Sequence, residues 1–423
     1  MSAQTEQATA HMNNQLAELQ SRYQAKQEKS LSLDMTRGKP SPEQLDLSNA
    51  LLAKVTPEDF KSASGLDCRN YGGLDGMPAT KQLFADFLEV QVSEVLVGDN
   101  ASLSLMHDTL VNALLHGVVG SAKPWIQSNP KFICPAPGYD RHFNVCQHTG
   151  IDMLTVDNTA EGPDMDAVEK LVGQDDSIKG IWIVPRYSNP TGTVCSDEVV
   201  DRLAKMKTAA SDFRIMWDNA YAVHHLTDSP RQLKNILAAC KAAGHPDRVF
   251  IFGSTSKITF AGAGLAAMAG SEANIDWMRK HRFMQTIGPD KLNQLRHIRF
   301  FPNGMADVEA HMKKHAAILR PKFNAVLAIL ERELGGKGIA SWTNPEGGYF
   351  ISLDVADGCA KRVVQLAGEA GVKLTPAGAS FPYRTDPRDR NIRIAPSLPS
   401  LPDLKEATEV LAICVQLAVA EQQ

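Results

Sequence analysis

The sequence predicts an α/β protein with a mainly parallel sheet in a large domain, followed by a smaller α+β domain. Short apolar runs of strand character alternate with helical patterns, and strands separated by helices form parallel sheets covered on both faces. The length of 423 residues exceeds what one simple core accommodates. After about residue 310 the pattern changes, which indicates a second domain. The predicted strands of the large domain lie in residues 131–137, 151–156, 178–185, 213–221 and 248–254.

The remaining elements follow in chain order. Residues 11–29 are polar and helix-prone, with Met12, Leu16, Leu19 and Tyr23 at helical spacing, and residues 36–48 form a Gly/Pro-rich loop. Helices are predicted at 81–91, 165–173, 197–210 and 311–335, strands at 347–355 and 391–396, and a helix at the C-terminus. We therefore divide the chain into an N-terminal helix and loop that pack with the small domain or a partner subunit (1–48), a large domain (49–315) and a small domain (316–423).

Composition argues against several classes of function. The net charge of −4 gives no basic surface for nucleic acid, and no apolar run approaches the ~18 residues that span a membrane. The seven cysteines are scattered singly, so a metal site is not expected, and reduced thiols are typical of the cytoplasm. The polar N-terminus lacks the apolar core of a secretory signal.

Three predicted strands end in chemically distinctive residues. Asn189 lies in an Asn-Pro-Thr-Gly turn, Asp218 and Tyr221 follow a second strand, and Lys257 follows a third. Taken singly, these are ordinary features: a turn, a helix cap and a solvated loop. Because ligands of parallel sheets bind beyond the carboxyl ends of the strands, we expect the three groups to converge at one crevice.

A lysine beside a carboxylate, an amide and a phenol suits one cofactor chemistry. A lysine amine of lowered pKa forms a Schiff base with an aldehyde, and pyridoxal 5′-phosphate (PLP) supplies an aldehyde on a ring that withdraws electrons while its nitrogen is protonated. Asp218 is the candidate partner of that nitrogen, and Asn189 and Tyr221 are candidates for the ring oxygen. Ser254 and Ser256 offer hydroxyls to the phosphate. A helix predicted to open at Asn100-Ala101-Ser102 offers backbone N–H groups.

These motifs resemble a known family. The segments NYGGLDG, PAPGYD, YSNPTG, DNAY, STSK and NIRIAP are similar to those of class I, fold-type I PLP-dependent aminotransferases, from about residue 34 onward. TRGKPSPEQLDLS and QTIGPDKLNQLRH look most like the aspartate aminotransferase subgroup. The resemblance implies a seven-stranded type of large domain and a cytoplasmic homodimer with shared active sites. It also implies a ping-pong exchange of L-aspartate and 2-oxoglutarate for oxaloacetate and L-glutamate.

The resemblance also implies roles for single residues. Lys257 would hold PLP and move the proton between substrate and cofactor, and Tyr139 would stack on the ring. Tyr71 would reach the phosphate of the other subunit's cofactor. Arg393, with Gly38 nearby, would grip the substrate α-carboxylate in a bidentate pair, and Asn189 would also face the substrate.

Two features depart from this pattern or leave it open. Leu265 and Ala266 stand where the family usually has a phosphate-binding arginine. A dicarboxylate substrate also needs a second cation, for which Arg37, Lys39 and Lys291 are the candidates, although each could equally be a solvated charge.

Parts of the sequence are also compatible with three other kinds of function. The G-x-G-x-x-A match at 262–267 fits a dinucleotide-binding oxidoreductase only if it opens a helix directly after a strand. A non-catalytic PLP-binding regulator would carry a DNA-binding domain, for which the residues before 36 show no helix-turn-helix pattern or basic charge. An aminotransferase for aromatic, alanine or branched-chain substrates, or a PLP β-lyase, remains possible on the same scaffold.

Overall fold

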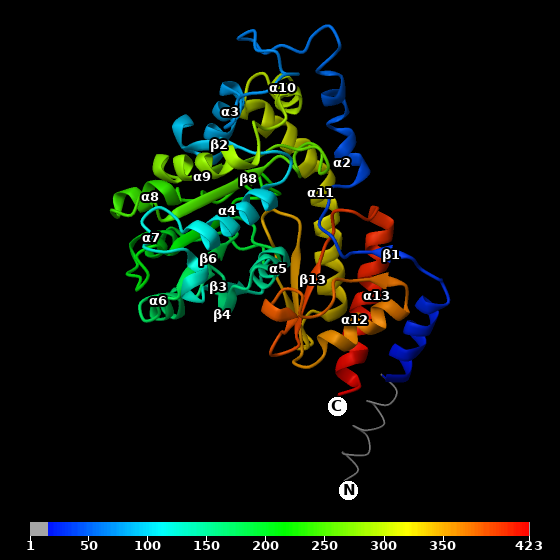
Figure 1. Cartoon of the computed structure of the whole chain (residues 1–423). Coiled ribbons are helices and arrows are strands. Elements are labelled where there is room, and N and C mark those ends of the chain that lie inside the picture. The colour runs from blue at the N-terminus through cyan, green and yellow to red at the C-terminus, as the bar shows by residue number, and fades with distance from the viewer. Residues whose placement is uncertain (1–15, 423) are drawn as a thin grey trace.

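The computed structural model describes residues 16–422 and confirms the α/β class (Figure 1). Its main sheet has eight strands in the order β2-β9-β8-β7-β6-β3-β4-β5. The five predicted strands are β3, β4, β6, β7 and β8, which pair in parallel, whereas β2, β9 and β5 pair antiparallel. The strand count differs from the predicted seven, since two-residue β5 pairs with the end of β4. The bounds are β2 Val95–Val97, β3 Lys131–Ala136, β4 Asp152–Thr159, β5 Gly162–Pro163, β6 Ile178–Ile183, β7 Arg214–Asp218, β8 Val249–Ser254 and β9 Ala266–Ala269.

Side-chain alternation along the strands builds an apolar core on each face of this sheet. On β7, Ile215 and Trp217 join the core covered by α3, α6, α7 and α8, whereas Met216 joins the opposite core with α4, α5 and α9. Both cores consist of buried side chains, as expected for a sheet covered on two faces. The helices are α3 Pro78–Leu88, α4 Ser102–His116, α5 Asp140–Thr149, α6 Met165–Val172, α7 Asp197–Lys205, α8 Ile236–Ala242, α9 Glu272–Gln285 and α10 Lys291–Phe300.

A third core surrounds a small antiparallel sheet in the order β10-β11-β13. Helix α11 (Met305–Leu334) joins the two parts of the molecule: Val308 and Met312 pack in a core of the large sheet, whereas Phe323 and Leu330 pack in the third core. Pro321 lies inside this helix, between Leu319 and Phe323 of the third core. The other elements are β10 Ala340–Trp342, β11 Ile351–Val355, α12 Ala360–Glu369, β12 Val372–Lys373, β13 Asn391–Ile394 and α13 Leu401–Ala420.

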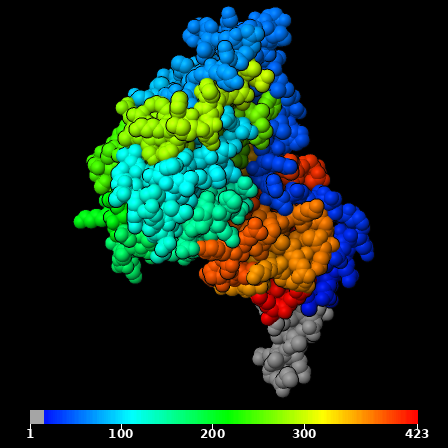
Figure 2. Space-filling view, viewed as in Figure 1, coloured from blue at the N-terminus to red at the C-terminus, as the bar shows by residue number. Residues whose placement is uncertain are grey.

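The N-terminal segment connects both parts of the molecule. Residues 16–27 are helical and lie against α12 and α13, where Lys26 pairs with Glu406 and Glu409 at 2.8 Å. Strand β1 (Leu33–Asp34) pairs with β12, and α2 (Pro42–Asp46) lies beside α11. In Figure 2 this segment, in dark blue, runs along the right side, from beside the orange and red part toward the lighter blue top. Residues 11–15 of the predicted helix, Met12 included, lie outside the described residues.

The domain boundaries at 48/49 and 315/316 stay predictions, and residue 315 falls inside α11. Within residues 16–422, no helix is both long and apolar enough to cross a membrane.

Candidate active site

A cavity of about 170 Å³ opens at the carboxyl ends of the large sheet. Four strand-end or strand-following segments reach it, together with the first turn of α4. Its lining includes nine of the residues that the sequence singled out: Ala101, Ser102, Tyr139, Asn189, Asp218, Tyr221, Ser254, Ser256 and Lys257. The expected convergence of strand ends is therefore what the structure contains.

Lys257 lies in the turn that follows β8, with its amine toward this cavity. The amine nitrogen is 5.0 Å from the centre of the Tyr221 ring. Desolvation by the surrounding protein lowers the pKa of Lys257, and the charge of Asp218 opposes that shift. A lowered pKa increases the fraction of free amine, which is the nucleophilic form.

Asp218, at the end of β7, is almost fully buried, and only one of its two carboxylate oxygens has a hydrogen-bond partner. Its Oδ2 lies 2.9 Å from His142 Nε2, and the His142 ring stacks on Trp182 at 4.2 Å and 10°. Its Oδ1 is buried with no hydrogen-bond partner among the described residues. A buried carboxylate oxygen without a donor is costly, so this atom is suited to a ligand that brings an N–H group.

Tyr139, Asn189 and Tyr221 complete the walls of the cavity. Burial raises the pKa of Tyr221 well above its ordinary value and also raises that of Tyr139, so both phenols stay protonated and can donate hydrogen bonds. Tyr139 meets the His142 ring edge-on, with centroids 4.9 Å apart. Asn189 Oδ1 accepts a long hydrogen bond of 3.4 Å from Arg393.

The hydroxyl-rich end of the cavity lies at the start of α4, with Ala101 as the N-cap residue. Ser254 donates to Ser256, and Ser256 donates to the Asn100 carbonyl, each at 3.2 Å. Lys257 is the only cation among the lining residues. Leu265 lies just before β9 and Ala266 is the first residue of that strand. Both are buried and apolar, so neither supplies a positive charge for the phosphate.

Gly262–Ala267 does not form the dinucleotide-binding arrangement. The segment is a loop that enters antiparallel β9, and no helix opens there. The oxidoreductase interpretation is therefore wrong.

Arg393, on β13 of the small sheet, is buried beside the cavity. Its Nη1 is 2.8 Å from Asp140 Oδ1, its Nη2 donates to Thr375 at 3.3 Å, and its guanidinium lies 5.0 Å from the Phe350 ring centre. Gly38 packs on that same ring, which a side chain at this position would strike. Gly38 and Arg393 therefore both lie against Phe350.

Six predicted residues do not line the cavity: Arg393 and Gly38, which lie beside it, and four others. Tyr71 is 82% exposed. Lys291 donates to the Gly72 carbonyl at 2.8 Å, and Arg37 and Lys39 are exposed. Within this chain these side chains lie outside the cavity, and their predicted roles stay untested.

Sequence reasoning missed His142 and Asp140. His142 lies about one helical turn after Tyr139. Predicting a helix over residues 140–149 would therefore have placed both side chains on the same face of that helix. Asp140 is the first residue of α5 and gives no signal of pairing with a residue 253 positions away.

Comparison with known proteins agrees with this geometry. A family model described as aspartate amino-transferase matches residues 5–423. The chain belongs to the aspartate amino-transferase family. A protein named aspartate aminotransferase from Corynebacterium glutamicum is 51% identical over 394 residues, which cover 93% of this chain and 91% of that one.

Solved structures of aminotransferases share the fold. The crystal structure of an aspartate transaminase from C. glutamicum has a TM-score of 0.95 and 48% identity, with 98% of this chain and 97% of that one covered. LysN, an α-aminoadipate aminotransferase from Thermus thermophilus complexed with N-(5′-phosphopyridoxyl)-L-leucine, has a TM-score of 0.76 at 21% identity, with 96% and 98% covered.

The cofactor of this aminotransferase is pyridoxal 5′-phosphate, and the site fits it. The unpartnered Oδ1 of Asp218 suits the protonated ring nitrogen, and the Lys257 amine suits the aldehyde. The start of α4 with Ser254 and Ser256 suits the phosphate.

Buried histidines hold the turn that carries Lys257 in this aminotransferase. His297 Nε2 lies 2.9 Å from the Thr259 hydroxyl and 3.2 Å from that of Thr255. His311 Nε2 lies 2.9 Å from the Ile258 carbonyl and 3.1 Å from His315 Nε2. Burial lowers the pKa of His297 and that of His315 to about 4.

We therefore expect the folded protein to lose stability in mild acid. Above pH 6.5 most of these imidazoles are neutral in both the folded and the unfolded chain. Between pH 6.5 and about 4, the histidines of the unfolded chain bind protons, whereas those of the folded chain stay neutral. Each histidine should then lower the free energy of unfolding by roughly 1 kcal/mol between pH 7.5 and pH 5.5. His297→Gln should flatten this pH dependence in urea unfolding. His148→Gln, at an exposed position of α5, is the control and should leave it unchanged; equal slopes for all three proteins would contradict the prediction.

Proposed function

We propose that this aminotransferase transfers the amino group between L-aspartate and 2-oxoglutarate, giving oxaloacetate and L-glutamate by a ping-pong route. The observation that carries the amino-transfer chemistry is the Lys257 amine in one cavity with the unpartnered Oδ1 of Asp218. The choice of aspartate is supported by the name of the 51% identical relative and by the TRGKPSPEQLDLS and QTIGPDKLNQLRH segments.

When bound, PLP supplies an aldehyde and a ring that stabilises negative charge at the substrate Cα. Lys257 acts as the base that takes the proton from the substrate Cα and as the acid that delivers a proton to the cofactor. Its lowered pKa favours the free amine for the first task. Asp218, oriented by His142, keeps the ring nitrogen protonated, while Asn189 and Tyr221 donate to the ring oxygen and Tyr139 covers the ring face.

Arg393 binds the substrate α-carboxylate in this proposal. Its Nη1 already holds one carboxylate, that of Asp140, at 2.8 Å, and its Nε is buried with no partner among the described residues. The guanidinium therefore keeps hydrogen-bonding capacity for an incoming carboxylate, with Gly38 against the Phe350 ring nearby.

The side-chain carboxylate of aspartate requires a second cation, which we assign to the group Arg37, Lys39 and Lys291. Removing all three charges should raise the KM for aspartate at least about 10-fold, because a charge-assisted hydrogen bond is worth roughly 1.5–3 kcal/mol. The KM for alanine should stay the same, which provides the internal control. If the triple variant keeps the wild-type KM for aspartate while its KM for alanine stays high, another residue binds the side-chain carboxylate.

A panel of half-reactions tests the substrate assignment directly. The loss of the absorbance of the loaded enzyme is followed after mixing with each of the twenty amino acids. Aspartate and glutamate should react fastest. If alanine, phenylalanine or a branched-chain amino acid reacts as fast, the assignment to aspartate is wrong although amino transfer stands.

We also propose a homodimer in which Tyr71 reaches the phosphate of the partner's cofactor. Support comes from the exposed apolar side chains of Tyr71, Phe283, Met284 and Ile287, since large exposed hydrophobic residues are typical of interfaces. Sedimentation velocity should give twice the chain mass. A monomer at micromolar concentration would contradict this arrangement.

A further inference from the structure

A second cavity, of about 1050 Å³, lies between β7, the end of α3, the loop after Tyr221 and α11. We call it the rear cavity. It shares its wall with the catalytic cavity: Trp217 and Asn219 line the rear cavity, whereas Asp218, between them, lines the catalytic one. In the same way Ala222 faces the rear cavity and Tyr221 the catalytic cavity.

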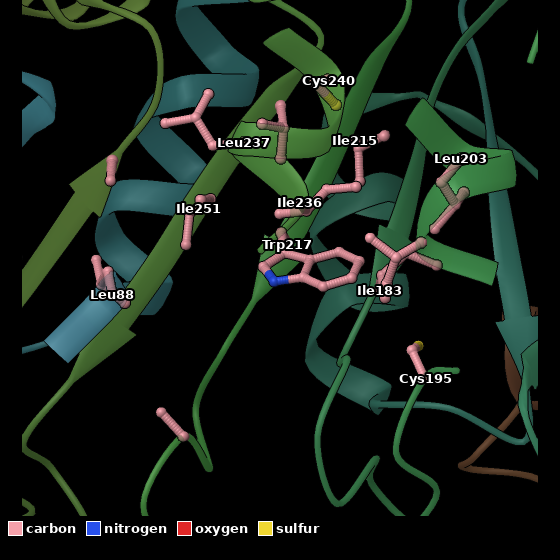
Figure 3. Close-up of a cluster of buried hydrophobic side chains, with 14 of the residues drawn as sticks. Leu88, Ile183, Cys195, Leu203, Ile215, Trp217, Ile236, Leu237, Cys240 and Ile251 are labelled. Carbon is pink, nitrogen blue, oxygen red and sulfur yellow. The ribbon is translucent and has the colours of Figure 1, made fainter. Parts of the chain in front are cut away.

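The floor of the rear cavity is apolar. Trp217 pairs in register with Ile251 on β8 and with Ile183 on β6, and its indole ring lies across this row in Figure 3. Leu88 and Ile236, from α3 and α8, also belong to this core. A flat ring bordered by aliphatic side chains suits an aromatic or aliphatic ligand body.

Two polar atoms on the walls have no hydrogen-bond partner: Asn219 Oδ1 and Arg186 Nε are buried and lack one among the described residues. Trp217, which is 2% exposed, adds an indole N–H donor to the lining. Native proteins rarely leave several buried polar groups unpaired in one place, unless a ligand or water completes them.

Four cations and four carboxylates line the rear cavity, and Arg186 is the cation considered for a ligand; the carboxylates are Asp86, Glu89, Asp228 and Glu309. The Arg186 guanidinium donates only to carbonyls, that of Ala222 at 2.9 Å and that of Arg231 at 3.2 Å. In residues 16–422, no carboxylate forms an ion pair with it, whereas Arg320 and Lys234 of the same cavity pair with Asp228 and Asp201. The charge of Glu89 opposes the lowering of the Arg186 pKa by burial, but the two form no ion pair, so the partly buried guanidinium keeps the capacity to pair with an anion.

We propose that the rear cavity is a second ligand site, which binds a small monocarboxylate with an apolar body and one hydrogen-bond donor. The carboxylate pairs with Arg186 and accepts from the Trp217 indole N–H, the donor group meets Asn219 Oδ1, and the apolar body covers Trp217 and Ile251. The occupant thus contacts the strand end that presents Asp218 and Tyr221 to the catalytic cavity. The site is independent of which amino acid the enzyme prefers.

The test uses 3-phenyllactate, which has a carboxylate, a hydroxyl donor and a phenyl ring but no amino group to transfer. Its binding to the PLP-loaded enzyme is measured by titration calorimetry. Arg186→Met should weaken binding at least about 10-fold, whereas Lys313→Met, which removes a cation from the exposed rim, should change it by less than about 2-fold. Ala316→Trp, which places a large ring from α11 into the cavity, should abolish binding.

Arg393→Leu distinguishes the two cavities, because it removes the carboxylate partner of the catalytic site. Binding should persist in this variant within about 2-fold. If Ala316→Trp does not fold, Ala317→Trp at the exposed rim replaces it, with bound-cofactor absorbance as the folding check. Binding that is lost in Arg393→Leu and kept in the α11 variant would overturn the proposal, as would no saturable binding up to about 10 mM.

Discussion

Replacing Lys257 with alanine should lower turnover by at least about 10⁴-fold. The substitution removes both the amine that captures the aldehyde and the group that moves the proton at Cα, and positioned proton transfer alone contributes about 10²–10⁴-fold. Turnover of aspartate with 2-oxoglutarate measures the effect. Lys405→Ala, at an exposed position of α13, is the matched control and should keep wild-type turnover.

Borohydride reduction provides a second measurement on the same variants. In the wild type and in Lys405→Ala, reduction should fix the cofactor to the peptide that contains Lys257, and in Lys257→Ala no peptide should carry it. A label on another lysine, or a Lys257→Ala enzyme that keeps more than about a tenth of wild-type turnover, would contradict the assignment of Lys257.

Asp218→Asn should lower kcat by about 10²–10³-fold with little change in KM. The carboxylate is buried, and its free oxygen is the acceptor suited to the protonated ring nitrogen, so a neutral amide removes roughly 3–4 kcal/mol of charge stabilisation. His142→Gln should cost only about 10-fold, because it changes the orientation of Asp218 and leaves the charge in place.

Steady-state kinetics of the two variants tests this order. Cofactor content after dialysis shows whether each variant still binds PLP. If Asp218→Asn retains the cofactor and wild-type kcat, then Asp218 does not control the ring nitrogen. If His142→Gln is the more damaged of the two, the contribution of His142 goes beyond orienting Asp218.

Much of the fold and the site could be predicted because the informative residues are local. Strands β6, β7 and β8 are fully buried, and Asp218 ends β7 while Asn189 and Lys257 lie in the segments that follow β6 and β8. Because ligands of parallel sheets bind beyond the carboxyl ends of the strands, these three residues could be predicted to lie together. Strands β2 and β9 escaped prediction, since they have three and four residues and β9 consists of alanine and methionine.

The rest depends on contacts between distant parts of the chain. Asp140 with Arg393 and His142 with Asp218 are pairs separated by 253 and 76 positions, and neither partner has a local pattern that announces the other. Arg186 is similar: its sequence neighbours belong to the catalytic turn, and only the folded loop shows that its guanidinium faces the opposite side of the sheet.

Pro321 has a mechanical consequence for this enzyme. Proline lacks the backbone N–H that would bond to the Ala317 carbonyl, so α11 lacks one hydrogen bond close to where its side chains change from the core of the large sheet (Met312) to that of the small one (Leu319). We expect bending at this point to tilt one part against the other while both cores stay packed. Since Arg393 belongs to the small sheet and Lys257 to the turn after β8 of the large one, such bending would change the distance between the proposed carboxylate-binding guanidinium and the amine.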